Sequence, residues 1–478
     1  MRKFPLAILA ISLLGNTACA VSGAGPDAQD AWYAAGRATI EAKLSKAPNR
    51  NRARNVILFV GDGLGVSTVT AARIYDGQTR GEPGEDNVLS FETFPYTALV
   101  KTYNTNQQVS DSAGTASAMN TGVKTRAGVL GISDAAHRQN CAEALANTVP
   151  TLAELAEARG ISTGIVTTTR LTHATPAAVY AHSPERDWED ISDMPAEARA
   201  GGCKSIARQF VEFPAGDGID VALGGGRSKF GPDLIEAWKA RYPKAAYVED
   251  RTALTAIDPA QTERVLGLFA KSHMTYMMDR AKNRGKAGTE SSPEPTLSEM
   301  TAKAIDVLSQ NDRGYYLMVE GGRIDHGSHA GLAGKALSES QEFARAVRVA
   351  LDKVDLDDTL ILVTADHSHV LTMAGYPTRG NPILGVVMGN DRHGNPSGKP
   401  VLAQDGHPYT TLGYQNGPGA VTGERPAPDT RPGAHQQALV PTLYHSAGGH
   451  ELSETHGGED VPLYAAGPWS ELASGVIE

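Results

Sequence analysis

The chemistry that this chain could perform lies first in its carboxylate and imidazole side chains. Six of them follow short apolar runs: Asp62, Glu320, Asp325, His329, Asp366 and His367. Bringing several such carboxylates together without a cation would be costly in repulsion and desolvation. Carboxylate with imidazole and no thiolate suits Zn²⁺, whereas an all-oxygen position suits Mg²⁺ or Mn²⁺. The sequence therefore predicts a metal centre.

A candidate nucleophile lies in VSDSAGTASAMNTG, residues 109–122. Ser112 precedes a run of small residues that favour a helix, and the first turn of a helix attracts anions through its free N–H groups and dipole. Taken alone, Asp111 or Ser112 reads equally well as a helix cap. The metal ligands elsewhere in the chain favour the nucleophile.

The elements that must position these residues follow an α/β pattern. NVILFV (55–60) leads into GDGLG, STGIVTTT (162–169) into RLTHATPAA, YYLMV (315–319) into EGGRIDHGSH, and TLILVT (359–364) into ADHSHV. Runs that are apolar on both faces are typical of parallel strands covered by helices. Since ligands bind beyond the carboxyl ends of such strands, we expect the four polar clusters to meet there.

The length and the net charge of the chain limit its domain organisation and its possible partners. At 478 residues and 41% hydrophobic, the chain can bury a large core, either as one α/β domain with insertions or as two domains. Its net charge of −10 and the lack of a dense basic run beyond the first few residues argue against a nucleic-acid-binding surface.

The N-terminus reads as a secretory signal, with a basic start, a short apolar core and then small residues. Residues 1–20 are predicted to be removed after Ala20, which gives a periplasmic or secreted protein. The alternative is a lipoprotein anchored to the membrane through Cys19. We favour the soluble form because Asn16 suits a lipidation signal poorly.

Removal of the signal leaves two cysteines, Cys141 and Cys203. In an oxidising compartment an even pair is typical of a disulfide. The alternative, thiolate metal ligands, lacks a second Cys or His at ligand spacing.

Six motifs appear in the order in which alkaline phosphatases carry them, and the chain resembles that family from about residue 30 to its end. The motifs are VGDGLG, DSAGTASAMNTG, THATPAA, EGGRIDHGSH, TADHSH and ETHGGEDVPLYAAGP. The resemblance implies a catalytic domain over 30–478 with two zinc ions and one magnesium ion. It also implies hydrolysis of phosphate monoesters at alkaline pH through a phosphoserine.

The resemblance also assigns roles. Ser112 would be the nucleophile, and Asp111 and Arg186 would bind substrate, with Arg186 holding two phosphate oxygens. One zinc would be held by Asp325, His329 and His456. The second, beside Ser112, would be held by Asp62, Asp366 and His367. Magnesium would be held by Asp62, Thr175 and Glu320, with His173 nearby.

Two histidines depart from the best-known bacterial pattern but are similar to the animal-type branch and some marine bacterial enzymes. His173 would orient water on the magnesium, and His326 a water on the phosphate; as an alternative, both are merely solvated near the site. In that branch Cys141 and Cys203 would be paired. A further calcium site is expected to be absent, because Lys271 and His273 stand where acids would be needed.

The resemblance also concerns assembly. Residues 376–450, rich in Gly and Pro, would form an inserted crown-like subdomain near the two-fold axis of a homodimer. The segment 30–44 is expected to form an amphipathic helix, which would either reach across to the other subunit or pack on its own domain.

Three alternatives to a phosphomonoesterase remain. A sulfatase of the same superfamily would need Cys/Ser-x-Pro-x-Arg, which DSAGT lacks, and a phosphodiesterase commonly uses Thr without an arginine such as Arg186. The third reading is a metal- or phosphate-binding protein without turnover, which an intact Ser112 disfavours.

Overall fold

The computed structural model describes residues 30–283, 293–421, 423–428, 442–444 and 453–478. The predicted signal, with Cys19, lies outside these ranges. The chain forms two units, residues 1–47 and 48–478. In the first, the helix expected over 30–44 is α1 (Ala31–Leu44), capped by Asp30, whose carboxylate accepts hydrogen bonds from the Trp32 and Tyr33 backbone N–H groups.

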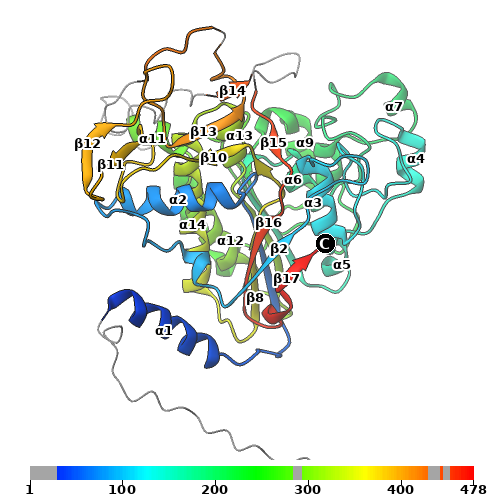
Figure 1. Cartoon of the computed structure of the whole chain (residues 1–478). Coiled ribbons are helices and arrows are strands. Elements are labelled where there is room, and N and C mark those ends of the chain that lie inside the picture. Colours follow the sequence, from blue (N-terminus) through cyan, green and yellow to red (C-terminus); the bar gives the residue numbers. More distant parts are fainter. Residues whose placement is uncertain (1–29, 284–292, 422, 429–441, 445–452) are drawn as a thin grey trace, which may run out of the picture. The chain divides into compact units, whose positions relative to one another are not determined.

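The second unit is built on a ten-stranded sheet in the order β17-β2-β16-β8-β1-β7-β3-β4-β6-β5 (Figure 1). Its strands are β1 (Asn55–Val60), β2 (Tyr96–Val100), β3 (Ser162–Arg170), β4 (Val221–Gly225), β5 (Ala246–Val248), β6 (Val265–Leu268), β7 (Tyr315–Glu320), β8 (Thr359–Thr364), β16 (Val461–Ala466) and β17 (Gly475–Ile477). The four strands predicted from apolar runs are β1, β3, β7 and β8.

The sheet is mainly parallel, as predicted. β1 lies between β7 and β8 and pairs in parallel with both, so that Val60 lies opposite Glu320 on one side and Thr364 on the other. β16 runs antiparallel to β8 and β2. The carboxyl ends of β1, β7, β8 and β3 therefore meet at one edge.

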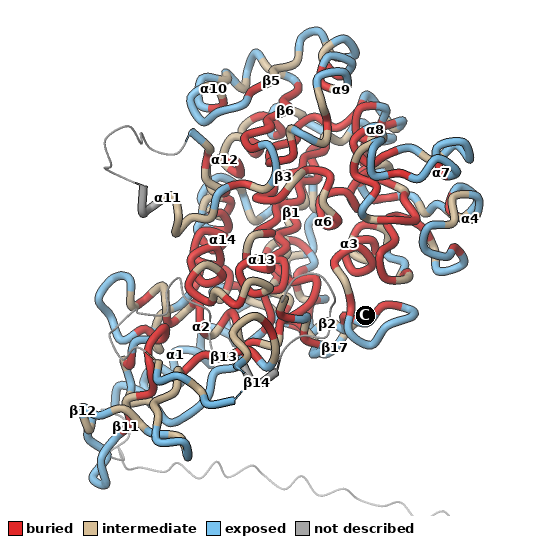
Figure 2. Tube along the Cα trace, turned by 90° about the horizontal axis from the view of Figure 1, so that it is seen from above, coloured by how far each residue is buried: buried red, intermediate tan, exposed pale blue. Residues whose placement is uncertain are grey.

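Helices cover both faces of the sheet because its central strands are apolar on both sides. Ile57 and Phe59 pack on one face, and Leu58 and Val60 on the other. The first face is covered by α2 (Val66–Gln78), α12 (Leu297–Leu308) and α14 (Ala333–Lys353). The second is covered by α3 (Ser112–Thr121), α5 (Leu152–Glu157), α6 (Ala174–Ala177), α8 (Ile206–Val211) and α9 (Arg227–Arg241). Figure 2 shows the buried strands between these helices, and the predicted α/β class is confirmed.

Shorter elements complete the described chain. The helices are α4 (Cys141–Ala146), α7 (Ala196–Ala200), α10 (Arg251–Ala256), α11 (Met277–Asn283) and α13 (Arg323–His329). The 3-10 turns are η2 (Ser90–Thr93), η3 (Pro259–Gln261) and η4 (Ser470–Leu472). In the ranges that the structure describes, every helix is too short or too polar to cross a membrane.

The segment 376–450, predicted to form a subdomain, lies partly outside the described residues. Three small sheets occur in and around it: β10-β13-β14, β11-β12 and β15-β9. Their strands are β9 (Ser368–His369), β10 (Leu371–Met373), β11 (Met388–Asn390), β12 (Pro396–Pro400), β13 (Leu412–Asn416), β14 (Thr442–Tyr444) and β15 (His456–Gly457). β15 pairs with β9, which brings His456 beside the segment that follows β8.

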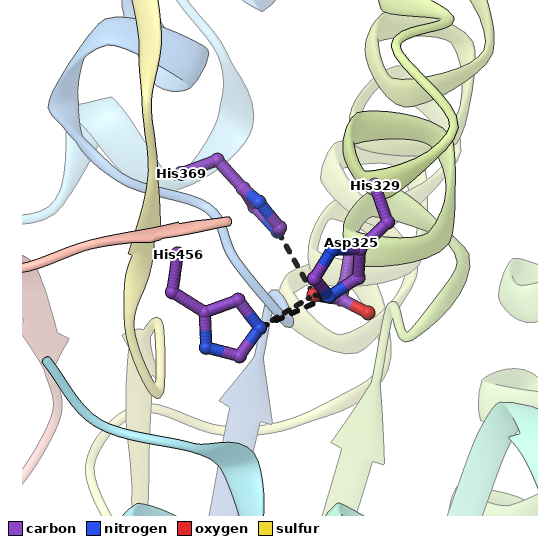
Figure 3. Close-up of side chains that lie close together, drawn as sticks. All are labelled: Asp325, His329, His369 and His456. Atoms are coloured by element: carbon purple, nitrogen blue, oxygen red, sulfur yellow. Dashed lines mark hydrogen bonds and ion pairs between the residues drawn. The ribbon is translucent and has the colours of Figure 1, made fainter. Parts of the chain in front are cut away.

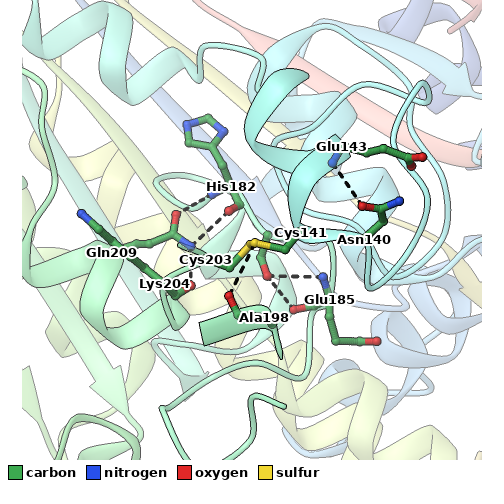
Figure 4. The surroundings of a disulfide bond; sticks show 10 residues. Asn140, Cys141, Glu143, His182, Glu185, Ala198, Cys203, Lys204 and Gln209 are labelled. Carbon is green, nitrogen blue, oxygen red and sulfur yellow. Dashed lines mark hydrogen bonds between the residues drawn. A yellow bond between two sulfur atoms is a disulfide. The ribbon is translucent and has the colours of Figure 1, made fainter. Parts of the chain in front are cut away.

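Cys141 and Cys203 form the predicted disulfide, with their Cα atoms 5.9 Å apart (Figure 4). It links the start of α4 to the loop after α7 across 62 residues of sequence. The bond is consistent with an oxidising compartment.

Candidate active site

The predicted ligands converge where the strands end. Asp62 lies two residues beyond β1, Glu320 ends β7, and Asp366 and His367 follow β8. The segment after β7 turns into α13, which places Asp325 and His329 on one helical face as their spacing predicted. The resulting side chains form three groups, each able to hold a metal ion.

The first group contains Asp325, His329 and His456 (Figure 3). Nε2 of His329 lies 3.2 Å from Oδ1 of Asp325, and Nε2 of His456 lies 3.5 Å from the same oxygen. The two Nε2 atoms are 3.0 Å apart. Burial alone would raise the pKa of Asp325, but His329, with His369 and His456, holds it well below its usual value.

The tautomers of these two imidazoles follow from their second nitrogens. Nδ1 of His329 donates to the backbone oxygen of Glu454 at 2.6 Å, and Nδ1 of His456 donates to that of Ser110 at 2.7 Å. When a ring is neutral, it therefore presents an unprotonated Nε2 to the other ring and to Asp325. Without a metal ion a proton takes this place, because Asp325 raises the pKa of His329 against the effect of burial. Three electron-pair donors that face one another fit a bound cation, and the backbone carbonyls orient the rings for it.

His369 joins this group, although the sequence analysis gave it no role. Its Nε2 donates to Oδ1 of Asp325 at 2.9 Å and its Nδ1 to Oε2 of Glu454 at 2.6 Å. Burial works against the charged ring, yet these two carboxylates raise the pKa of His369 to about 10. Since both nitrogens carry protons, His369 holds Asp325 in place. The available signal was its position two residues after His367 in TADHSH.

The second group surrounds Ser112. Nε2 of His367 lies 3.1 Å from Oγ of Ser112, 3.3 Å from Oδ1 of Asp62 and 3.4 Å from Oδ2 of Asp366. Three oxygens of this group accept no hydrogen bond from the described residues: both oxygens of Asp62 and Oδ2 of Asp366. Burial and the neighbouring carboxylates raise the pKa of Asp62 well above its usual value. These buried acceptors without donors fit a cation.

The third group shares Asp62 and adds Glu320. Oε2 of Glu320 accepts hydrogen bonds from Thr167 and Thr169, but its Oε1 and the Thr175 hydroxyl have no hydrogen-bond partner in the described chain. Burial raises the pKa of Glu320 to about 7. His173 lies near Asp62 and Glu320 and completes this group. The oxygen-rich set suits magnesium.

Ser112 is the first residue of α3, and the helix begins there because Asp111 caps it. Oδ1 of Asp111 accepts from the Gly114 backbone N–H at 3.2 Å, and its Oδ2 accepts from that of Gly128 at 2.9 Å. Gly122 ends the helix with a φ of 72°, a conformation that favours glycine. Asp111 is therefore the cap of α3, and the hydroxyl of Ser112 lies beside the predicted metal ligand His367.

Arg186 extends toward the same place. Its Nη1 donates to Oδ2 of Asp111 at 3.2 Å, and its Nη2 lies 3.4 Å from Nε2 of His173. Nδ2 of Asn104 donates to Oδ1 of Asp111 at 3.0 Å. Asp111 is thus fixed by an amide, two backbone N–H groups and Arg186, and it aims the guanidinium toward the N-terminus of α3.

Three imidazoles pack beside the third group. The ring of His326 lies 5.4 Å from that of His173 and 4.3 Å from that of His273, measured between centroids. Nη1 of Arg323 donates to Nδ1 of His326 at 2.9 Å, and burial lowers the pKa of His326 to about 3. The sequence connects His273 only with a calcium site that is expected to be absent, and its isolated position gives no signal of this packing.

A serine at a helix N-terminus, an arginine beside it and three groups that fit metal ions define a metal-dependent enzyme of phosphoryl transfer. The comparisons identify the family. The family model for alkaline phosphatase matches residues 53–478. The chain therefore belongs to the alkaline phosphatase family, whose members are hydrolases of phosphate monoesters.

Individual relatives agree. The tissue-nonspecific isozyme of alkaline phosphatase from Gallus gallus is 44% identical over 463 residues, covering 90% of this chain and 83% of the relative. An alkaline phosphatase from Gadus morhua is 41% identical and covers 94% of both chains. The solved structure of the Thermus thermophilus enzyme is similar in fold, with a TM-score of 0.62, 24% identity and coverage of 91% of each chain.

Proposed function

We propose that this alkaline phosphatase works through a covalent phosphoserine at Ser112, with the other residues acting as described below. One observation carries the proposal: Oγ of Ser112 lies at the N-terminus of α3 and 3.1 Å from Nε2 of His367. Nδ1 of His367 donates to the backbone oxygen of Ser368 at 3.2 Å, which leaves Nε2 without a proton in the neutral ring. The positive end of the helix and the ring nitrogen both favour loss of the proton from this hydroxyl.

Two displacements follow. The Ser112 hydroxyl releases its proton to solvent, and Oγ forms a bond to phosphorus as the bond from phosphorus to the alcohol oxygen breaks. The alcohol leaves with a proton taken from solvent. Water then attacks the phosphoserine, the bond from phosphorus to Oγ breaks, and inorganic phosphate leaves while the serine regains its proton. The guanidinium of Arg186 and the backbone N–H groups of α3 hold the negative charge on the phosphoryl oxygens.

We assign two zinc ions and one magnesium ion to the three groups. Asp325, His329 and His456 would hold one zinc. The set for the second is Asp62, Ser112, Asp366 and His367, and the set for magnesium is Asp62, Thr175 and Glu320 with His173. When bound, these cations stabilise negative charge on the attacking and leaving oxygens. A solved variant of the TAB5 alkaline phosphatase is described with Mg bound in its M3 site, which supports magnesium in the third set.

The test compares the wild type with Ser112→Ala at alkaline pH on p-nitrophenyl phosphate, bis-p-nitrophenyl phosphate and p-nitrophenyl sulfate. We expect monoester turnover to dominate and Ser112→Ala to lower it by at least about a thousandfold, with zinc content kept through the remaining ligands. Acid quenching of the wild type should trap phosphate on Ser112. A preference for the diester or the sulfate, or full activity in Ser112→Ala, would contradict the proposal.

The remaining assignments concern assembly and location. We propose a homodimer, with residues 376–450 as an inserted subdomain near its two-fold axis, and secretion through removal of residues 1–20. The disulfide and the basic, apolar N-terminal sequence support an oxidising destination. Light scattering of the mature protein tests the dimer, and mass spectrometry of its N-terminus distinguishes cleavage after Ala20 from a lipid on Cys19.

A further inference from the structure

A cavity of about 300 Å³ lies between α3 and the central sheet. Its helical wall is formed by one face of α3, on which Gly114, Ala118 and Gly122 recur every four residues. Their small side chains leave the space open. Gly114 cannot be larger, because a Cβ there would lie 2.4 Å from the side-chain oxygen of Asn104. The close contact between α3 and Asn104 therefore requires a small residue at position 114, which keeps this part of the cavity open.

The opposite wall is mainly apolar and only partly covered, and it also includes Thr364 and the proposed metal ligand Asp366 at the end of β8. It includes Leu58 of β1, Leu362 of β8 and Leu463 of β16. Leu362 and Leu463 are only partly buried, although strands of a mainly parallel sheet are normally covered on both faces. In Figure 1, α3 and α5 lie near β17 at this side of the sheet. A cavity lined mainly by apolar side chains, with a few polar groups at its edge, suits a small ligand with an apolar, ring-sized body.

The mouth of the cavity is polar, and its two ammonium groups share one carboxylate. Nζ of Lys101 lies 2.5 Å from Oε1 of Glu478, and Nζ of Lys124 lies 3.5 Å from Oε2. The ammonium of Lys124 also donates to the backbone oxygens of Lys101 and Tyr103. Since each cation already has an acceptor, the mouth favours an uncharged ligand. Glu478 remains able to accept one further hydrogen bond.

We propose that this cavity is a binding site for a small uncharged aromatic compound that carries one N–H or O–H group. The ring would replace the missing cover over Leu362 and Leu463, and its donor would meet the carboxylate of Glu478. Burial of ring surface supplies the affinity, and the single polar contact sets the orientation.

A ligand bound in the cavity would affect the phosphate site through Asn104. This residue lines the cavity and donates to Asp111, which in turn accepts from Arg186. The ligand also contacts the helix that presents Ser112. We therefore expect it to change kcat and leave KM nearly unchanged, because it does not compete with the substrate for Arg186.

The probe is indole, which has one N–H donor and no hydroxyl that could accept a phosphoryl group. Its binding to the metal-loaded enzyme is measured by calorimetry with inorganic phosphate at saturation, so that the active site is filled. We expect one molecule per chain and a saturable fall in kcat. An absence of saturable binding, or displacement by phosphate, would overturn the proposal.

Variants locate the site. Leu463→Trp fills the cavity from β16 and Ala118→Leu fills it from α3, and each should weaken indole binding at least tenfold. The matched control is Leu99→Trp on β2: Leu99 pairs with Pro462 and not with Leu463, so it lies on the other face of the sheet. Binding equal to the wild type in both filled variants would place indole elsewhere, whatever their activity.

Discussion

The Nε2 atoms of His329 and His456 lie 3.0 Å apart, and the other nitrogen of each ring donates to a backbone carbonyl oxygen. Two unprotonated nitrogens at this distance repel each other unless a proton or a metal ion lies between them. The hydrogen bonds to the backbones of Glu454 and Ser110 therefore orient both rings for a cation before it arrives.

The first prediction concerns this pair. His456→Ala removes one of three ligands, and we expect the affinity of the first site for zinc to fall by at least a hundredfold, since the alanine supplies no electron pair. Competition with a chelator of known affinity measures the loss. His393→Ala, in an exposed loop, is the control and should bind zinc as the wild type does. Unchanged affinity in His456→Ala would exclude His456 as a ligand.

The second prediction concerns Glu454, which no metal group includes. Its carboxylate is fully buried and accepts from His369 at 2.6 Å and from the Val370 backbone N–H at 2.8 Å. Glu454→Gln keeps the shape but removes the charge that keeps His369 protonated, so Asp325 loses a charged donor. We expect zinc affinity to fall about 10- to 100-fold, as for other groups that orient metal ligands.

The matched variant for this prediction is Glu454→Asp, which keeps the charge on a shorter side chain and should recover part of the affinity. Zinc binding by chelator competition is read beside kcat, because a merely structural role would lower stability without changing zinc affinity. Equal zinc affinity in Glu454→Gln and the wild type would remove Glu454 from the site.

The third prediction concerns the pH dependence of stability in the metal-free protein. Burial raises the pKa of Glu320 from 4.5 to about 7. The protonated form is thus favoured by folding, so this stabilisation is complete below about pH 4.5 and is lost as the pH rises through 7. Unfolding in urea should show the metal-free protein losing on the order of 2–3 kcal/mol from this group between pH 5 and 8.

Metal ions should reverse that loss, because a cation removes the cost of the ionised carboxylate. Glu320→Gln is the control, since it cannot ionise and should have a flatter profile in the metal-free state. A wild-type stability that rises between pH 5 and 8 without metal would contradict the assigned direction.

Much of this fold and site could be predicted from the sequence, because the signals for the strands and for the ligands that follow them were local. The apolar runs of β1, β3, β7 and β8 predicted strands, and the polar residues directly after them predicted where a parallel sheet would bring ligands together. The spacing of Asp325 and His329 predicted their shared helical face. These inferences required only periodicity and the rule that strand ends meet.

What could not be predicted depended on contacts between distant segments. His369 touches Glu454 across 85 residues of sequence, and His273 reaches His326 from the loop after β6. The isolated His and Glu in these places have no spacing pattern. Arg186 followed only from the family resemblance, because its role depends on Asp111, 75 residues away. The cavity behind α3 likewise depends on which strands the small residues of that helix face.

The fourth prediction separates the charge of Arg186 from its shape. Its planar guanidinium donates to Asp111 with Nη1 and can still present a fork of two parallel N–H groups to a phosphoryl group. A lysine ammonium has further donors but lacks this fork. Arg186→Lys should therefore lower kcat/KM for p-nitrophenyl phosphate about 10- to 100-fold, the loss of one or two hydrogen bonds to charged oxygens. Inhibition by inorganic phosphate should weaken in parallel. Asp111→Asn, which keeps the cap but removes the charge that aims Arg186, should show a smaller loss in the same direction. If Arg186→Lys kept both kcat/KM and phosphate affinity, a single positive charge would suffice at this position, and the two-point grip on phosphate would be wrong.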